Sequence, residues 1–124
     1  MSERNKEIIK KVNASFAEGN TDKFLTFCVD DVKWTMVGDR TVQGKDAIRK
    51  WLASMDSKEA PKFTVDHLIG EGDFVMAHGD MTMKDQDGKL ASYSYCDVYR
   101  FRGDKIAELN AFVIKTEPKL QPSA

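Results

Sequence analysis

The sequence predicts an α+β domain in which three helices from the first half of the chain pack on one face of a long antiparallel or mixed β-sheet. The first half of the 124 residues contains three amphipathic helical patterns. The second half alternates apolar and polar residues with a period of two, and turns rich in glycine and aspartate separate the alternating segments. Long antiparallel strands must twist, so we expect the sheet to curve into a cone around the helices. We expect one domain over residues 1–115 and a flexible tail over residues 116–124.

Two helices are predicted at the start of the chain. Apolar residues spaced three and four apart over residues 8–16 indicate the first helix, and Gly19 is its stop signal. The polar cluster at residues 20–22 is typical of a helix cap. A short second helix with apolar residues over 24–28 follows, and we expect it to end at residues 30–31.

A strand and a third helix come next. Val32, Trp34 and Met36 alternate with other residues before a turn at residues 38–39, which predicts a strand followed by a second, paired strand. From Gly44 the pattern is helical again, and its apolar stripe consists of Ala47, Ile48, Trp51, Leu52 and Met55. This helix is expected to give way to a polar loop over residues 54–61.

The rest of the chain is predicted to be a meander of long strands. The four strands span residues 63–69, 74–84, 90–102 and 106–115. Each pair is separated by a short segment of glycine and charged residues, which is the usual signal for a hairpin.

Composition excludes several functions. The 19 basic and 20 acidic residues give a net charge of −1, so we expect no nucleic-acid partner, because phosphate binding needs clustered positive charge. No apolar run is long enough for a membrane span or a secretory leader, so we expect a cytoplasmic protein without a membrane partner. Cys28 and Cys96 are expected to be unpaired, buried small hydrophobic residues, and we expect no metal site and no cofactor.

Asp97 is the most unusual residue of the strand region. It shares one strand face with aromatic residues, which are Tyr93, Tyr95, Tyr99 and Phe101. Desolvation on such a face would raise the pKa of the carboxyl, as expected of an acid–base catalyst or a ligand contact. The alternative is a carboxylate satisfied by tyrosine hydroxyls or backbone groups within a static core.

Four motifs in order connect the chain to a known family. They are Phe27-Cys-Val-Asp-Asp-Val-Lys-Trp34, Gly44-Lys-Asp-Ala-Ile-Arg-Lys-Trp51, Glu71-Gly-Asp-Phe-Val75 and Asp97-Val-Tyr-Arg-Phe-Arg-Gly-Asp-Lys-Ile106. Over residues 3–115 the sequence resembles the SnoaL-like and ketosteroid-isomerase-like branch of the nuclear transport factor 2-like superfamily. The resemblance implies a cystatin-like cone. It also implies a homodimer formed through the outer face of the sheet.

The same resemblance places an apolar interior around Asp97. Its expected lining residues are Trp34, Met36, Tyr95, Tyr99, Leu109, Ala111 and Val113. An apolar pocket with one polar group is typical of a small-ligand site, although a packed core has the same composition.

The catalytic patterns of the family transfer only in part. Asp97 matches the oxyanion aspartate of the isomerases, but their base position falls on Met36 and their tyrosine position on Val12. A thioether cannot accept a proton at neutral pH, so the ketosteroid isomerase route is disfavoured. The epoxide hydrolase route is disfavoured because Ala111 occupies its last aspartate position.

The polyketide cyclases of the family are a closer match. They resemble the chain in having an acid–base aspartate at the position of Asp97, together with a histidine on an adjacent strand. His67 and His78 lie on the two preceding strands, but neither falls at a clear motif position, and the sequence assigns them no role.

Three functional hypotheses follow. In the first, the interior binds a small apolar or carbonyl-containing molecule through Asp97. In the second, Asp97 is the acid–base residue of a cofactor-free isomerase or cyclase. In the third, the domain is a dimerisation or interaction module whose outer face, with Ser92, Ser94 and Cys96, is the functional surface.

Overall fold

The computed structural model describes residues 2–54, 62–84 and 87–116. The helices are α1 (Ser2–Ala17), α2 (Thr21–Thr26) and α3 (Lys45–Ser54). The strands are β1 (Cys28–Met36), β2 (Arg40–Gln43), β3 (Lys62–Phe63), β4 (His67–Glu71), β5 (Phe74–Lys84), β6 (Leu90–Arg102) and β7 (Lys105–Lys115). The predicted α+β class, with three helices in the first half of the chain, is confirmed.

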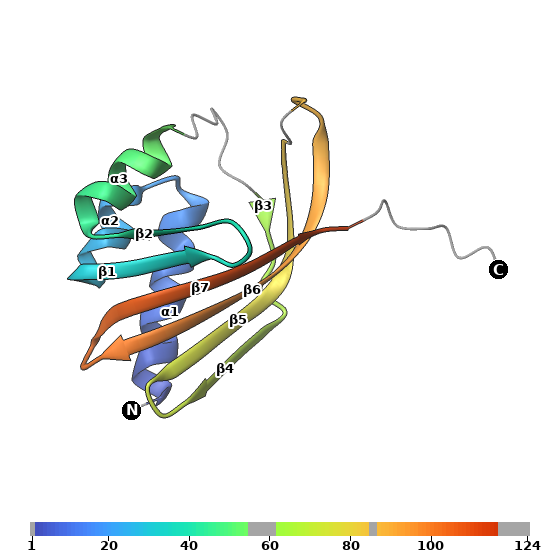
Figure 1. Ribbon diagram of the computed structural model, residues 1–124. Coiled ribbons are helices and arrows are strands. Elements are labelled where there is room, and N and C mark those ends of the chain that lie inside the picture. Colours follow the sequence, from blue (N-terminus) through green and yellow to red (C-terminus); the bar gives the residue numbers. More distant parts are fainter. Residues whose placement is uncertain (1, 55–61, 85–86, 117–124) are drawn as a thin grey trace.

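All described strands belong to one mixed sheet. Its order is β2-β1-β7-β6-β5-β3, and β4 also pairs with β5. The β1–β7 pair is parallel, whereas the other described pairs are antiparallel. Figure 1 shows α1 running across the back of the sheet, while α2 and α3 lie towards β1 and β2. The front of the sheet carries no helix from the described part of the chain.

The core lies between the helices and the face of the sheet that they cover, which we call the inward face. Ile9 and Val12 of α1 and Ile48 of α3 are fully buried. On β5, Val75 and Ala77 are buried while Met76 between them is exposed. This period of two determines which face of each strand turns inward, because a one-residue shift would expose the apolar set. Among the described helices, none has the length and apolar character that crossing a membrane requires.

The prediction for the second helix is wrong at its C-terminal end. α2 ends at Thr26, and Cys28 already belongs to β1 rather than to the helix. Cys28 is aligned with Ile106 in the parallel β1–β7 pair, and the Ile106 amide donates to the Phe27 carbonyl at 2.8 Å. The residues at 30–31, expected to end the helix, lie within β1 and are exposed. Pairing with a distant strand therefore overrides the local helical pattern.

The single strand predicted over residues 63–69 is also wrong. It is divided into β3 and β4, which both pair with β5, and residues 64–66 between them pass over Gly79. The Thr64 amide donates to the Asp80 carbonyl at 2.9 Å, and the Asp66 amide donates to the His78 carbonyl at 2.7 Å. A Cβ on Gly79 would lie 2.0 Å from the Thr64 carbonyl oxygen, so only glycine allows this crossing.

Other predictions differ in detail. Ile48 of the predicted apolar stripe is buried, but Ala47 is exposed. Both cysteines are free, as expected, but Cys96 is half-buried rather than buried. The predicted loop over 54–61 and the tail over 116–124 lie almost entirely outside the described residues, as does Met55.

Candidate ligand-binding site

The strand register brings the predicted interior residues together in adjacent rows of the inward face. Trp34, Leu109 and Tyr99 are direct neighbours across β1, β7 and β6. The next row contains Met36, Ala111 and Asp97, and the row after it contains Val113 and Tyr95. Tyr95, Tyr99, Leu109 and Ala111 are buried, whereas Trp34, Met36 and Val113 are half-buried.

Asp97 is a half-buried carboxyl between two small residues. Its neighbours on the adjacent strands are Ala77 and Ala111, whose methyl groups offer no hydrogen bond. Desolvation alone raises the pKa of Asp97 from 3.8 to about 7, and no described residue offsets this with a hydrogen bond or a positive charge. Asp97 therefore populates both its protonated and its ionised form near neutral pH.

The two tyrosines that flank Asp97 along β6 differ in their hydrogen bonding. The Tyr95 hydroxyl donates to the Thr64 carbonyl at 2.5 Å, which ties β6 to the segment before β4. The Tyr99 hydroxyl is buried and has no hydrogen-bond partner among the described residues. Burial first and the nearby Asp97 charge second raise the pKa of Tyr95 to about 12 and that of Tyr99 well above its usual value.

Trp34 belongs to an aromatic cluster that joins β1 to the helices. Its ring lies 5.9 Å from Phe16, 5.5 Å from Phe24 and 5.2 Å from Trp51, with edge-on geometry toward Phe24 and Trp51. Its indole Nε1 is buried without a hydrogen-bond partner in the described residues, and the same holds for Oδ1 of Asn5 on α1. Buried polar atoms are normally paired, so the indole N–H as a donor and the amide oxygen as an acceptor are sites where a ligand or water would gain a hydrogen bond. Asn5 carries no sequence signal, because nothing in the helical pattern separates it from a solvent-facing residue.

The positions that the family patterns assign to further catalytic groups carry none. Val12 is fully buried in the core, and Ala111 is buried beside Asp97. Met36 shares a row with Asp97 but has no titratable group.

The two histidines lie on the opposite face from Asp97. His67 and His78 are exposed, and they face each other across β4 and β5 with their Nδ1 atoms 3.4 Å apart. Neither one can serve as a partner of Asp97 through the sheet. The signal for their pairing was in the sequence, because a two-residue turn at Gly72–Asp73 places 67 opposite 78.

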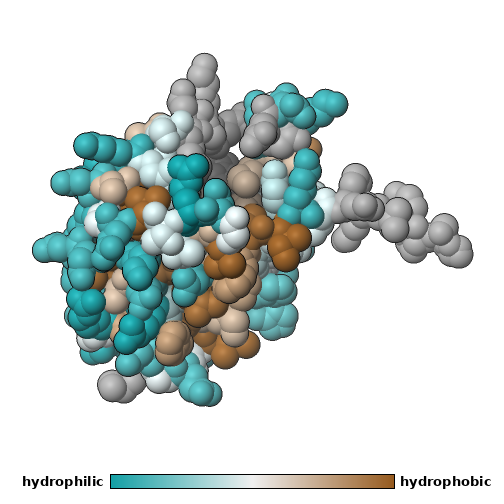
Figure 2. All heavy atoms as spheres, viewed as in Figure 1, coloured by the Kyte–Doolittle hydropathy of each residue, from teal (hydrophilic) through white to brown (hydrophobic). Residues whose placement is uncertain are grey.

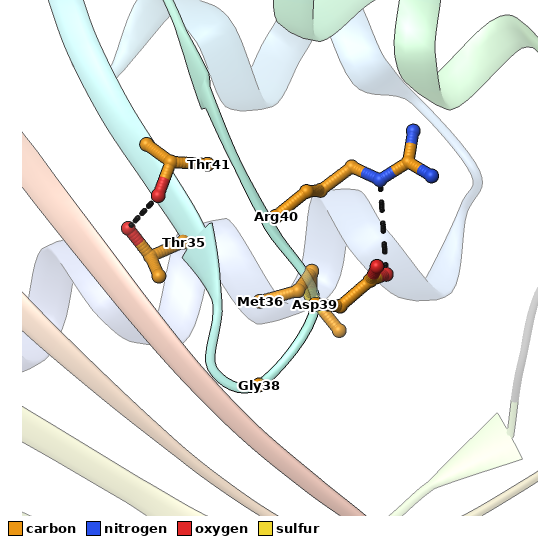
Figure 3. Close-up of a pocket in the computed structure, with 6 residues that line it drawn as sticks. All are labelled: Thr35, Met36, Gly38, Asp39, Arg40 and Thr41. Atoms are coloured by element: carbon orange, nitrogen blue, oxygen red, sulfur yellow. Dashed lines mark hydrogen bonds and ion pairs between the residues drawn. The ribbon is translucent and has the colours of Figure 1, made fainter.

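A shallow pocket of about 370 Å³ lies at the β1–β2 hairpin (Figure 3). It is lined by Thr35, Met36, Gly38, Asp39, Arg40 and Thr41. Its polar groups are already paired, since the Thr35 and Thr41 hydroxyls are 3.0 Å apart and Arg40 Nε is 3.7 Å from Asp39. Asp97 is not among its lining residues, and Met36 is the one residue that the pocket shares with the candidate site.

Comparison with known proteins defines the family. A SnoaL-like domain model matches residues 9–109, so the chain belongs to the SnoaL-like domain family. Among curated proteins, none matches the sequence.

Solved structures agree on the fold. A nuclear transport factor 2-like protein of unknown function from Cytophaga hutchinsonii is 24% identical with a TM-score of 0.73, and the match covers 88% of this chain and 98% of that one. TerC, co-crystallised with polyporic acid, is 20% identical with a TM-score of 0.78, over 88% of this chain and 90% of TerC. A proposed polyketide cyclase from Xanthomonas campestris is 15% identical with a TM-score of 0.80, over 90% of both chains. At these identities the likeness establishes the nuclear transport factor 2-like fold alone.

Proposed function

We propose that this SnoaL-like domain binds a small apolar or carbonyl-containing molecule against its inward face, with Asp97 as the principal polar contact. The observation that carries the proposal is a desolvated carboxyl that no described residue pairs, set in rows of apolar and aromatic side chains. An unpaired buried polar group costs free energy, and a ligand carbonyl or hydroxyl would recover part of that cost.

The protonation of Asp97 suits a carbonyl ligand. With a pKa of about 7, a large share of the carboxyl is protonated near neutral pH and can donate a hydrogen bond to a carbonyl oxygen. The unpaired Tyr99 hydroxyl lies two residues along the same strand face and supplies a second donor. Aromatic walls from Trp34 and the tyrosines would hold the apolar part of the ligand.

The structural neighbours support this proposal at the level of the fold. TerC was crystallised with polyporic acid, and the Xanthomonas campestris protein is a proposed polyketide cyclase. A fold of this kind can therefore accommodate a small organic acid.

A binding experiment with the variant Asp97→Asn tests the proposal. The two tryptophans of the chain, Trp34 and Trp51, are in ring contact at the inward face and report on it by fluorescence. We expect saturable quenching by polyporic acid or acetophenone, and an affinity about tenfold lower for Asp97→Asn, because an amide N–H is a weaker hydrogen-bond donor than a carboxylic acid O–H.

The exposed Asp104 in the β6–β7 turn provides a matched control, and Asp104→Asn should bind as the wild type does. Equal affinity of wild type and Asp97→Asn, or no saturable binding of either probe, would contradict the proposal.

A second function, acid–base catalysis by Asp97, is favoured by its pKa of about 7. A base with a pKa near the working pH can remove a proton next to a carbonyl and return it elsewhere, as an isomerase or an aldol cyclase requires. Acetophenone in heavy water tests this directly, because enolisation exchanges its α-hydrogens. Exchange accelerated by wild type but not by Asp97→Asn would support catalysis, whereas equal rates would leave a binding function only.

We also propose that a second copy of the chain covers the outer face of the sheet. This face carries the outer apolar stripe, which we define as Ile69, Phe74, Met76, Phe112 and Ile114, each 37% to 66% exposed. Figure 2 shows brown side chains running across the front of the sheet. A contiguous apolar patch without helical cover is typical of an interface, and two-fold symmetry would bury it against itself.

A further inference from the structure

The histidine pair on the outer face has a geometry that the proposed function does not use. His67 and His78 are the only histidines of the chain, and they are direct cross-strand partners in the β4–β5 hairpin. Their rings are 5.6 Å apart between centroids and are inclined by 34°. Two imidazole rings therefore lie next to each other on one hairpin.

The distance between the two Nδ1 atoms fits a shared metal ion better than a hydrogen bond. At 3.4 Å the pair is at the long limit of a hydrogen bond, for which about 2.9 Å is usual. Two nitrogens that bind one tetrahedral ion at about 2.0–2.1 Å are themselves about 3.3–3.4 Å apart. Small rotations of two exposed side chains are all that an ion would require.

The charges around the pair favour a cation. Asp80 lies on the same face of β5, two residues after His78, and its carboxylate accepts a hydrogen bond from Ser94 at 3.1 Å. The three cross-strand rows of β5, β6 and β7 at and beside His78 contain no lysine or arginine. Imidazole is a good ligand for the later first-row divalent ions, which prefer nitrogen over oxygen donors.

We propose that His67 and His78 form a two-ligand site for a divalent transition-metal ion such as Zn²⁺ or Ni²⁺, bound through both Nδ1 atoms and completed by water. No group of three or more histidine, cysteine or acidic residues among the described residues could hold a metal, so the protein supplies two ligands. The hairpin holds the second imidazole close to the first, which raises its effective concentration and makes the pair bind better than either ring alone.

The position of the pair separates this site from the proposed ligand site at Asp97. It lies on the opposite face from Asp97, so ligand binding at the inward face can fail while metal binding succeeds. The pair shares the outer face with the outer apolar stripe, because His78 lies in one cross-strand row with Cys96 and Phe112, and His67 pairs with His78 two residues from Ile69 and Met76.

The experiment is a calorimetric titration of the untagged protein with Zn²⁺ and, separately, with Ni²⁺ at pH 7.5, together with proton spectra of the imidazole rings. We expect one ion per chain and perturbation of both ring spectra. His67→Gln and His78→Gln should each lower the affinity by about tenfold or more. Both side chains are exposed, so the variants should keep the far-ultraviolet circular dichroism of the wild type.

Cys96→Ser is the matched control, because Cys96 is the neighbour of His78 on β6. Unchanged binding in Cys96→Ser alongside weakened binding in both histidine variants supports the site. The proposal is overturned if either histidine variant binds as the wild type does, if binding depends on Cys96, or if the stoichiometry is one ion per two chains.

Discussion

At the scale of single residues, Asp97 has an environment that opposes its charge. Its row neighbours are alanines, and the adjacent rows are aromatic or aliphatic, so its ionised form loses hydration without gaining a partner in the described residues. Such a group is retained at a cost to stability, which is common at functional sites.

This cost gives a pH-dependent stability that can be measured. The folded pKa of about 7 lies above the reference value of 3.8, so the folded state holds the proton more tightly than the unfolded chain does. The stabilising effect is complete below about pH 4 and is lost as the pH rises to about 7. We expect urea unfolding to show that, as the pH rises across this range, the free energy of unfolding of the wild type falls by roughly 2–4 kcal/mol relative to that of Asp97→Asn. Parallel pH profiles would show that the Asp97 carboxyl is not desolvated.

At the scale of elements, the crossing of residues 64–66 over Gly79 links three strands. The Thr64 carbonyl accepts a hydrogen bond from the Tyr95 hydroxyl of β6. The Thr64 amide donates to the Asp80 carbonyl of β5, and the Asp80 amide donates to the Thr64 hydroxyl at 3.1 Å. The crossing therefore holds one flank of the inward face beside Tyr95. Its requirement for glycine is steric, because the Thr64 carbonyl occupies the place of a side chain.

Gly79→Ala should destabilise the protein by roughly 2–3 kcal/mol, since the methyl group must displace backbone rather than a flexible side chain. Urea unfolding measures this. Gly38→Ala is the comparison, because its φ is +88° but nothing lies within 4 Å of an added Cβ, so only backbone strain of about 1 kcal/mol is expected. A smaller decrease in the free energy of unfolding for Gly79→Ala than for Gly38→Ala would contradict the close approach of residues 64–66 to Gly79.

At the scale of the whole molecule, one face of the sheet is covered by helices and the other is open. The outer apolar stripe lies on the open face and passes over β4, β5 and β7. Apolar residues at these outward positions do not contribute to the core of one chain.

The dimer proposal predicts that charge on this stripe disrupts association. Phe112→Glu together with Ile114→Lys should convert a dimer into a monomer in sedimentation velocity at micromolar protein. Leu90→Lys, which changes an exposed leucine at the start of β6 outside the stripe, should leave the dimer intact. A wild-type monomer at that concentration would rule the proposal out.

The local patterns were sufficient for most of the fold. The turn segments over residues 70–73 and 103–104 and the period of two predicted strands 74–84 and 90–102 with the observed bounds. The same period put Asp97 on the face of Tyr95 and Tyr99, as the register has it. Short-range turn chemistry and strand alternation determine these features, and both are properties of neighbouring residues.

The sequence by itself thus determined the α+β class, the three helices, the long hairpins and the residues of the inward face. Only the tertiary structure decided that β1 pairs in parallel with β7, which takes Cys28 into the sheet. It also decided that the strand pairing is interrupted at residues 64–66, where the chain crosses Gly79. It also decided that Asp97 has no described partner. These features depend on residues that are distant in sequence, and the free energy of burying or pairing a group depends on neighbours that only the folded chain supplies.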